Sequence, residues 1–207
     1  MQVTVFGASG RVGRLVVQRL LDDGYAVVAF VHKTTPVAHS KLKTVTGDVH
    51  DAKAVSQAVQ GSDIVISTLG SWGTKSKDIL SSAMRTIIPA MQSAGIKRIV
   101  AVTGSGAYAP GDTPSIIDIV GHFTFGIIAK KIITDSEAHL QLLHDSGLDW
   151  TVIRSPVMTG SNRTGYTLTS TAPLPWEVVS RFAVAKAIVD QVSAHPKSLA
   201  APFIHRG

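Results

Sequence analysis

The sequence predicts an α/β fold: a doubly wound parallel sheet with helices on both faces. Short apolar segments rich in β-branched residues alternate with longer segments whose apolar residues recur at helical spacing. Apolar residues make up 44% and charged residues 16% of the 207 residues, which is typical of a compact domain. We find no linker, internal repeat or low-complexity segment. Residues 1–207 are therefore expected to form a single domain.

The expected elements follow one another along the whole chain. Strands are expected at 3–6, 26–31, 43–46, 63–68, 99–102, 149–154, 165–169 and 199–205, the last of them at a sheet edge. Helices are expected at 12–21, 51–59, 77–95, 129–145 and 176–192. Pro89 falls inside the third helix and is expected to kink it. Glycines and prolines interrupt the pattern over 109–128, which predicts a partly helical flap over a pocket, and 157–175 is expected to be a loop region that carries specificity.

The first strand runs directly into a glycine-rich turn, Gly7-Ala-Ser-Gly-Arg-Val-Gly13, and then into a helix. Gly7 lets the chain turn tightly, Gly10 leaves no side chain between the backbone and a ligand, and Gly13 lets the helix lie close to the sheet. The first amides of that helix then point at a pyrophosphate. This context predicts a Rossmann-like dinucleotide site, although the spacing is G-x-x-G-x-x-G rather than G-x-G-x-x-G. An ordinary glycine-rich turn is the alternative.

The residues after the second strand favour NADP(H) over NAD(H). An acidic residue there would bind the ribose 2′-hydroxyl of NAD, whereas a basic residue would bind the 2′-phosphate of NADP. The chain reads Val31-His32-Lys33-Thr34-Thr35, with no carboxylate nearby, and Arg11 could approach the same phosphate. Alternatively, Lys33 is simply a solvated surface lysine.

The composition excludes several other classes of protein. The net charge is +6 and the pI is about 9.7, but the basic residues are scattered, which favours an anionic small molecule over nucleic acid. No apolar run has membrane-spanning length, no signal peptide is recognised, and a cytoplasmic protein is expected. The chain lacks cysteine, and its eight histidines show no metal-ligand spacing, so no metal site is expected. The sequence leaves a homodimer open.

Five segments, in this order, resemble the NmrA-like NAD(P)H-binding group of atypical short-chain dehydrogenases/reductases, which includes biliverdin-IX-beta/flavin reductase. They are residues 7–13, 47–49, 67–70, 102–105 and 146–156. The last segment, Ser-Gly-Leu-Asp-Trp-Thr-Val-Ile-Arg-Ser-Pro, is the most specific of them, and the resemblance covers nearly the whole chain.

The resemblance implies which residues would bind the cofactor. The pyrophosphate would be held by Gly7, Ser9, Gly10, Arg11, Val12 and Gly13, and the 2′-phosphate by His32 and Lys33. Asp48 and Val49 would meet the adenine, with the Asp48 carboxylate accepting a hydrogen bond from the exocyclic amine. Thr68, Leu69 and Gly70 would border the ribose, Thr103 and Ser105 would approach the nicotinamide, and Pro156 would abut its ring.

One departure from the wider superfamily matters for the chemistry. Most of its dehydrogenases use a Tyr-x-x-x-Lys pair, in which the lysine lowers the pKa of the tyrosine. Tyr108 has Asp112 four residues on, and the positions where related proteins place the pair are Ile132 and Ser136. Alcohol oxidation by the standard route is therefore not expected.

This absence favours an NADPH-dependent reductase of a small conjugated acceptor, a flavin or a quinone, that receives the hydride directly. Ser105 and Tyr108 are the candidate catalytic hydroxyls, although each can equally be a loop residue. Trp72 could stack on the acceptor, or it covers the core. A non-catalytic NAD(P)-sensing regulatory protein is the main alternative. A nucleotide-sugar epimerase or dehydratase is disfavoured, because the chain lacks the larger carboxy-terminal substrate lobe of those enzymes.

Overall fold

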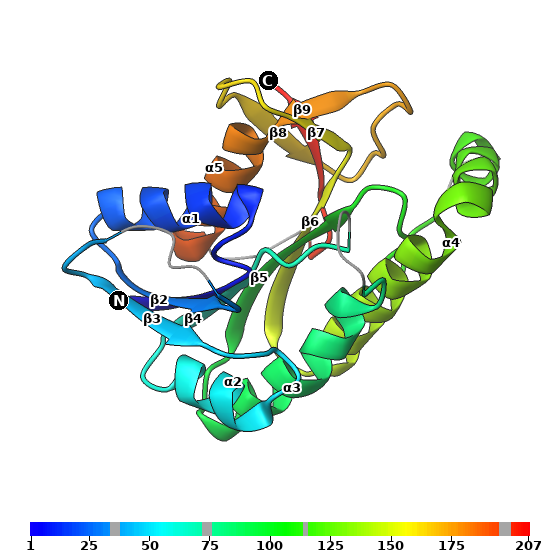
Figure 1. Cartoon of the computed structure of the whole chain (residues 1–207). Helices are drawn as coiled ribbons and strands as arrows, with labels where there is room; N and C mark the ends of the chain where they lie inside the picture. The colour runs from blue at the N-terminus through cyan, green and yellow to red at the C-terminus, as the bar shows by residue number, and fades with distance from the viewer. Residues whose placement is uncertain (34–37, 72–75, 114–115, 195–199) are drawn as a thin grey trace.

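The computed structural model describes residues 1–33, 38–71, 76–113, 116–194 and 200–207, with the backbone alone over 116–129. Figure 1 shows the arrangement of its helices and strands. In chain order they are β1 (Gln2–Phe6), α1 (Arg11–Asp22), β2 (Ala26–Val31), β3 (Leu42–Thr46), α2 (Ala52–Val59), β4 (Ile64–Ser67), α3 (Ile79–Ser93), β5 (Arg98–Gly104), α4 (Ile116–Asp145), β6 (Asp149–Ser155), β7 (Val157–Thr159), β8 (Tyr166–Thr169), β9 (Val178–Ser180), α5 (Arg181–Ser193) and β10 (Phe203–Arg206).

Eight strands form one sheet in the order β3-β2-β1-β4-β5-β6-β10-β8. All neighbouring pairs are parallel except β10 and β8, which are antiparallel. The order reverses between β1 and β4, and in such sheets ligands bind beyond the carboxyl ends of the strands at this reversal. The predicted α/β fold with a doubly wound, mostly parallel sheet is confirmed.

Helices cover both faces of the sheet, because successive side chains of its strands point to opposite sides. Val27 and Ala29 belong to the core beneath α1 and α5, whereas Val28 and Phe30 belong to the core shared with α2 and α3. Figure 1 shows α1 and α5 on one side of the sheet, and α2, α3 and α4 on the other. None of the described helices is both long and apolar enough to cross a membrane.

The last third of the chain departs from the sequence-based expectations. The predicted loop over 157–175 contains β7 as well as β8, and the helix expected at 176–192 starts only at Arg181, because residues 178–180 form β9 beside β7. The strand expected at an edge, β10, lies between β6 and β8. The partly helical flap at 109–128 is helical from Ile116 and continuous with the helix expected at 129–145. Glycine in a helix interior costs only about 1 kcal/mol, so two glycines do not stop this helix.

The start of α3 is capped by a side chain from α4. Asp78, at the N-cap position, makes no capping bond through its side chain. The buried carboxylate of Asp135 instead accepts hydrogen bonds from the amides of Leu80 (3.0 Å) and Ser81 (2.8 Å), and from Oγ of Ser71 (2.9 Å). One carboxylate thereby joins two helices to the loop that leaves β4, where the sheet order reverses.

Candidate functional site

The turn between β1 and α1 packs tightly against the exit of β4. Gly7 has a φ of 74°, a left-handed conformation that favours glycine, and a Cβ there would lie 2.9 Å from the amide nitrogen of Leu69. A Cβ at Gly13 would lie 2.1 Å from the carbonyl oxygen of Gly7 and 2.8 Å from Oγ1 of Thr68. Since backbone atoms occupy these places, a side chain at either glycine would force α1 away from the sheet.

Within the described parts of the chain, no side chain caps the first amides of α1. Gly10 is the N-cap residue, with an extended backbone, and the first helical turn contains no acidic residue. The Gly10 amide donates to the carbonyl of Gly7 over 2.9 Å, and Nε of Arg14 donates to the carbonyl of Ser9 over 3.0 Å. These bonds fix the turn, while the helix N-terminus keeps its partial positive charge for an anion.

Thr68 fastens β4 to β1 at the reversal of strand order. Its amide and its Oγ1 both donate to the carbonyl of Phe6, each over 2.9 Å. Leu69 is half-buried, and a Cβ at Gly70 would meet no atom within 4 Å. The backbone of residues 68–70 therefore borders open space beside the glycine turn.

The exits of β2 and β3 carry charges of both signs. His32, Lys33 and Arg11 are exposed. Asp48 follows β3, and its carboxyl has a pKa below the ordinary value. The main cause is the hydrogen bond that the His50 backbone amide donates to the carboxylate, and the second is the hydrogen bond with the His50 imidazole. A smaller contribution comes from the charge of His32, so strand pairing brings a carboxylate within electrostatic reach of a segment that has none in its local sequence.

The exits of β5 and β6 are joined side by side. The Ser105 amide donates to the Ser155 carbonyl over 2.8 Å, and Oγ of Ser155 donates to the carbonyl of Pro156 over 3.0 Å. Thr103 is buried, and its Oγ1 has no hydrogen-bond partner among the residues the structure describes. A Cβ at the neighbouring Gly104 would meet no atom within 4 Å. A buried hydroxyl without a partner is costly, and a polar group of a ligand that reached it would supply one. The open space at Gly104 lies on the opposite face, since successive residues of β5 point to opposite sides of the sheet.

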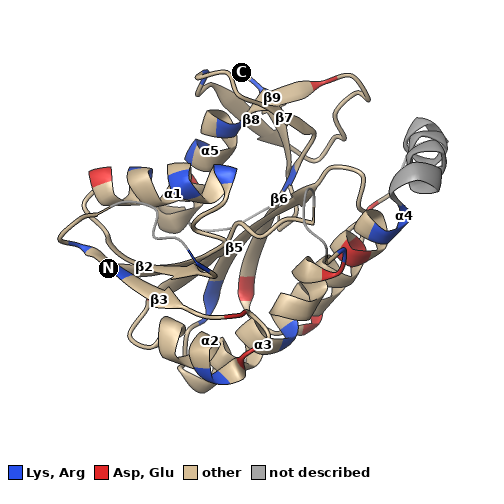
Figure 2. Ribbon diagram, in the orientation of Figure 1, with Lys and Arg blue, Asp and Glu red and all other residues tan. Residues whose placement is uncertain are grey.

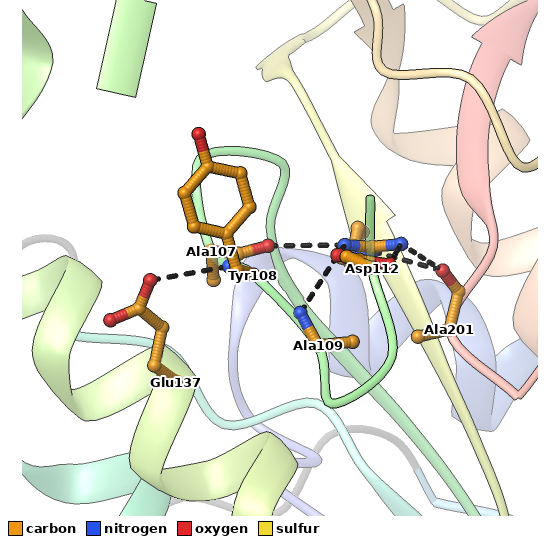
Figure 3. A network of polar contacts seen from close by, with 7 residues as sticks. Ala107, Tyr108, Ala109, Asp112, Glu137 and Ala201 are labelled. Atoms are coloured by element: carbon orange, nitrogen blue, oxygen red, sulfur yellow. Dashed lines mark hydrogen bonds and ion pairs between the residues drawn. The ribbon is translucent and has the colours of Figure 1, made fainter. Parts of the chain in front are cut away.

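Arg154, the penultimate residue of β6, holds the loop that follows β5. Its guanidinium is 2% exposed, forms a bidentate ion pair with Asp112, donates to the carbonyl of Ala107 over 3.2 Å, and donates twice to the carbonyl of Ala201. All five of its N–H groups are therefore used. The Phe203 ring lies beneath it, 3.7 Å from Cζ. Figure 3 shows this network.

Tyr108 lies in the loop that Arg154 holds. Its amide donates to Oε1 of Glu137 on α4 over 3.3 Å, and the amide of Ala109 donates to Asp112 over 2.8 Å. In Figure 3 the Tyr108 ring points away from Asp112, the residue four positions on. The tyrosine is thus positioned by its backbone, and the residue in the place of a partnering lysine is an acid.

The positions on α4 that correspond to the usual tyrosine–lysine pair carry no proton-transfer chemistry. Ser136 is 2% exposed, and its Oγ donates to the carbonyl of Ile132 over 2.8 Å, inside the helix itself. This hydroxyl is therefore committed to the helix backbone.

The structure places most of the residues expected at the site along one edge of the sheet. This edge carries Gly7, Ser9, Gly10, Arg11, Val12, Gly13, His32, Lys33, Asp48, Thr68, Leu69, Gly70, Thr103, Ser105 and Pro156. Val49 follows β3 at the same edge, but its side chain is 8% exposed and belongs to the core. Trp72 lies outside the described residues. Within the described residues, no group of three histidine or acidic side chains is placed to hold a metal ion.

Two positioning residues, Arg154 and Asp135, were missed as parts of the site. Arg154 interrupts an apolar strand, and a charge at a buried position needs partners, so this signal was available. Its partner Asp112 lies on a separate loop, which local sequence does not place. Asp135 looks like an ordinary polar residue of a helix, and its role depends on the packing of α3 against α4.

The fold and the site together define a dinucleotide-binding protein of the Rossmann type. A family model described as NAD(P)H-binding matches residues 7–195, and the chain belongs to this NAD(P)H-binding family. An uncharacterized protein of Mycobacterium tuberculosis is 26% identical over 163 residues, which are 78% of this chain and 16% of that protein. The chain thus spans about a sixth of the length of this relative.

Two solved structures share the fold over almost the whole chain. A short-chain dehydrogenase/reductase of Veillonella parvula in complex with NADP superimposes with a TM-score of 0.78 at 21% identity, covering 99% of this chain and 94% of that one. The anaerobillin reductase ChuY of Escherichia coli O157:H7 gives a TM-score of 0.80 at 22% identity, covering 100% and 97%. The family match confirms the predicted NAD(P)H-binding family, and these two structures confirm the fold.

The residues present fit a nicotinamide dinucleotide. The glycine turn lies so close to the exit of β4 that a Cβ at Gly7 or Gly13 would clash with backbone atoms, and the N-cap residue of the helix behind it offers no side-chain cap. At the other end of the edge, the buried hydroxyl of Thr103 has no partner among the described residues, and the neighbouring Gly104 faces open space. These two ends suit the pyrophosphate and the nicotinamide amide, respectively.

Proposed function

We propose that the protein is an NADPH-dependent reductase that transfers a hydride directly to a small conjugated acceptor, such as a flavin or a quinone. The observation that carries this proposal is the state of α4, where Ile132 and Ser136 replace the tyrosine and lysine and the serine hydroxyl is bonded to the helix backbone. A dinucleotide site without that pair suits acceptors whose reduction does not require a tyrosine to exchange a proton with an alcohol or carbonyl oxygen. The reductase ChuY, which shares the fold, adds support.

In this proposal the chain binds and orients the cofactor and the acceptor, and the reduced nicotinamide supplies the hydride. The amides at the start of α1 hold the pyrophosphate, while Thr103 and Pro156 fix the nicotinamide against the end of the sheet. The proton comes from water or from the hydroxyl of Ser105 or Tyr108, which lie on the loop after β5. Arg154 keeps that loop in place.

We also propose that NADP is preferred over NAD. Lys33 and His32 are exposed where the 2′-phosphate would lie, and Arg11 is exposed at the start of α1. Asp48 is the opposing charge, but the two hydrogen bonds from His50 already hold its Oδ1. The cationic side chains therefore dominate the local field.

Anaerobic oxidation of NADPH in the presence of FMN, riboflavin or simple quinones tests the reductase activity. Turnover is expected with at least one acceptor. A Gly70→Val variant serves as the matched control: its side chain would enter open space at the exit of β4, so we expect it to fold normally and lose NADPH binding and turnover together. Cofactor binding by the wild-type protein without turnover of any of these acceptors would contradict the proposal.

The same state of α4 favours a second candidate, a cofactor-sensing protein without catalysis. It requires a protein partner whose affinity follows the bound cofactor, and similar affinities for NADPH and NADP⁺. Pull-down experiments with each cofactor form separate the two candidates. A set of partners that is identical with NADPH, with NADP⁺ and without cofactor would rule the sensor out.

A further inference from the structure

The small sheet formed by β7 and β9 carries a pocket beyond the end of β6. It has a volume of about 260 Å³ and is lined by Thr159, Ser161, Arg163, Val178, Ser180 and Arg206. Its walls are held by hydrogen bonds, since Oγ of Ser180 donates to the carbonyl of Ser161 and accepts from the amide of Phe182. The pocket is large enough for a group of several heavy atoms, because a water molecule occupies about 30 Å³.

Both arginines of this pocket, Arg163 and Arg206, are exposed. Neither guanidinium forms an ion pair with a carboxylate in the described parts of the chain. The carboxylate of Glu177 is held by the ring of His205 over 3.0 Å, and it also accepts from the backbone amide of Arg206. Successive side chains of β10 point to opposite faces, so the side chain of Arg206 lies on the other face from this contact. Figure 2 shows basic positions around β8, α5 and the C-terminus.

An apolar surface connects this pocket to the nicotinamide end of the site. Val157 follows Pro156 directly and is 65% exposed, and Val178 is its neighbour in the β7–β9 pairing and is 40% exposed. Val178 also lines the pocket. At a strand rise of about 3.3 Å per residue, Thr159 lies roughly 10 Å along the chain from Pro156. Two exposed valines are thus flanked by the expected nicotinamide position on one side and by two arginines on the other.

We propose that this pocket binds an anionic substituent of the acceptor, a phosphate or a carboxylate, while the conjugated ring lies on Val157 and Val178 beside the nicotinamide. This inference rests on the proposed reductase function and specifies the substrate class: a planar conjugated molecule with an anionic group about 10 Å from the ring position that accepts hydride. Two guanidinium groups that pair with no carboxylate of the described residues match such a group in charge and in hydrogen-bond geometry.

Matched pairs of probes test this proposal by binding rather than turnover. FMN and riboflavin differ only in the phosphate, and a naphthoquinone that carries a carboxylate on an alkyl chain reaching about 10 Å from the ring differs from its methyl ester only in that charge. The full chain saturated with NADP⁺ is titrated with each compound. In at least one pair, the anionic member is expected to bind about tenfold more tightly than its neutral twin.

The arginines are then removed together, in an Arg163→Ala/Arg206→Ala variant. The affinity for the anionic probe is expected to fall to that of its neutral twin, while the affinity for NADP⁺ reports whether the cofactor site is intact. Lys97→Ala removes an exposed positive charge at the opposite, amino end of β5 and is expected to leave the preference for the anionic probe unchanged.

Equal affinities within both pairs, including no binding by any of the four compounds, would overturn the proposal, as would a double variant that keeps its preference for the anion. The two proposals fail in distinguishable ways. Selective binding of the anionic probe without NADPH oxidation contradicts only the reductase function. Turnover with equal KM for FMN and riboflavin, and for the two quinones, contradicts only the anion pocket.

Discussion

Basic side chains of this protein occur in two opposite environments. Lys33 is exposed at the edge of the sheet where a phosphate is expected, so its charge costs nothing to keep in water. His139, on α4, is fully buried, and neither ring nitrogen has a hydrogen-bond partner among the described residues. The first is accessible to a ligand, and the second destabilises the folded state.

Lys33→Glu tests the choice of cofactor. Reversing this charge beside the 2′-phosphate should weaken NADPH binding at least tenfold, about 1.4 kcal/mol, because an attractive contact becomes a repulsive one. NADH lacks that phosphate, and its affinity should change little. Titration of both cofactors measures the effect, and an equal loss for the two would show that Lys33 does not contact the 2′-phosphate.

His139→Leu tests the cost of the buried imidazole. Burial lowers the pKa of His139 from 6.5 to about 4, opposed by the nearby charge of Asp135. Between these two values the unfolded chain binds a proton that the folded chain does not, so the free energy of unfolding falls as the pH falls from about 6.5 to 4. The loss from this histidine is about 3 kcal/mol over that range.

The leucine variant lacks this titration. The difference in the free energy of unfolding between the variant and the wild type should therefore grow as the pH is lowered from 7 to 4. At pH 7 the variant should be at least as stable as the wild type, because two unpaired ring nitrogens are removed. Denaturant unfolding across this range is the measurement. Parallel stability profiles for the two proteins would contradict the expectation.

At the scale of elements, Asp135 shows how one helix depends on another. Both of its carboxylate oxygens accept hydrogen bonds, one from the Ser81 amide and the other from Ser71 and the Leu80 amide. An asparagine would present an NH₂ group to donors on one side. We therefore expect Asp135→Asn to lower the free energy of unfolding by about 2–4 kcal/mol.

Asp51→Asn is the matched control for this variant. Asp51 caps α2 through Oδ1 alone, which accepts from the amides of Lys53 and Ala54, and asparagine keeps that acceptor. Its cost should be only a few tenths of a kcal/mol. Equal losses for the two variants would mean that the charge, and not the second acceptor, stabilises the α3 cap.

The elements also show how far the sequence predicts the fold. From β1 to β6 the strands and helices are long enough for their periodicity to be decisive, and the glycine turn fixes the order of β1 and α1. Residues 157–180 form three short strands, in which hydrophobic alternation is too brief to read. The segment 176–180 has apolar residues at spacings that suit the start of a helix, but its pairing with β7, a tertiary contact, makes it a strand.

The candidate site was predicted unevenly for a similar reason. The glycine turn and the residues that follow each strand can be recognised from local sequence, and the structure places them together at one edge of the sheet. The approach of Asp48 to His32 and the ion pair of Arg154 with Asp112 depend on strand order and loop path. Arg163 and Arg206 are separated by more than forty positions, and they line the same pocket because β10 pairs with β8, where Arg206 lies opposite Tyr166.

At the scale of the whole molecule, Arg154 joins three parts of the chain: β6, the loop after β5, and the segment before β10. Arg154→Met removes its five hydrogen bonds and leaves Asp112 without its cation. We expect the free energy of unfolding to fall by about 3–5 kcal/mol. For a chain of this size that corresponds to a decrease in Tm of about 6–20 °C.

Amide hydrogen exchange distinguishes destabilisation of the segments that Arg154 joins from destabilisation of the whole sheet. In Arg154→Met, amides at 105–112 and 203–206 should lose protection together, while those of β1 and β4 keep theirs. Asp112→Asn, which leaves the arginine bonds to Ala107 and Ala201, should show a smaller loss in the same places. Uniform loss across the sheet in both variants would contradict this role.

The position of β10 between β6 and β8 has a consequence for how the protein forms during synthesis. β8 leaves the ribosome well before β10, yet it has no place in the sheet until β10 has added to β6. The β1–β6 portion can assemble from neighbouring strands as it emerges, whereas β8 waits with unpaired backbone groups. During this interval the unpaired backbone groups of β6 and β8 are open to pairing with a second copy of the chain.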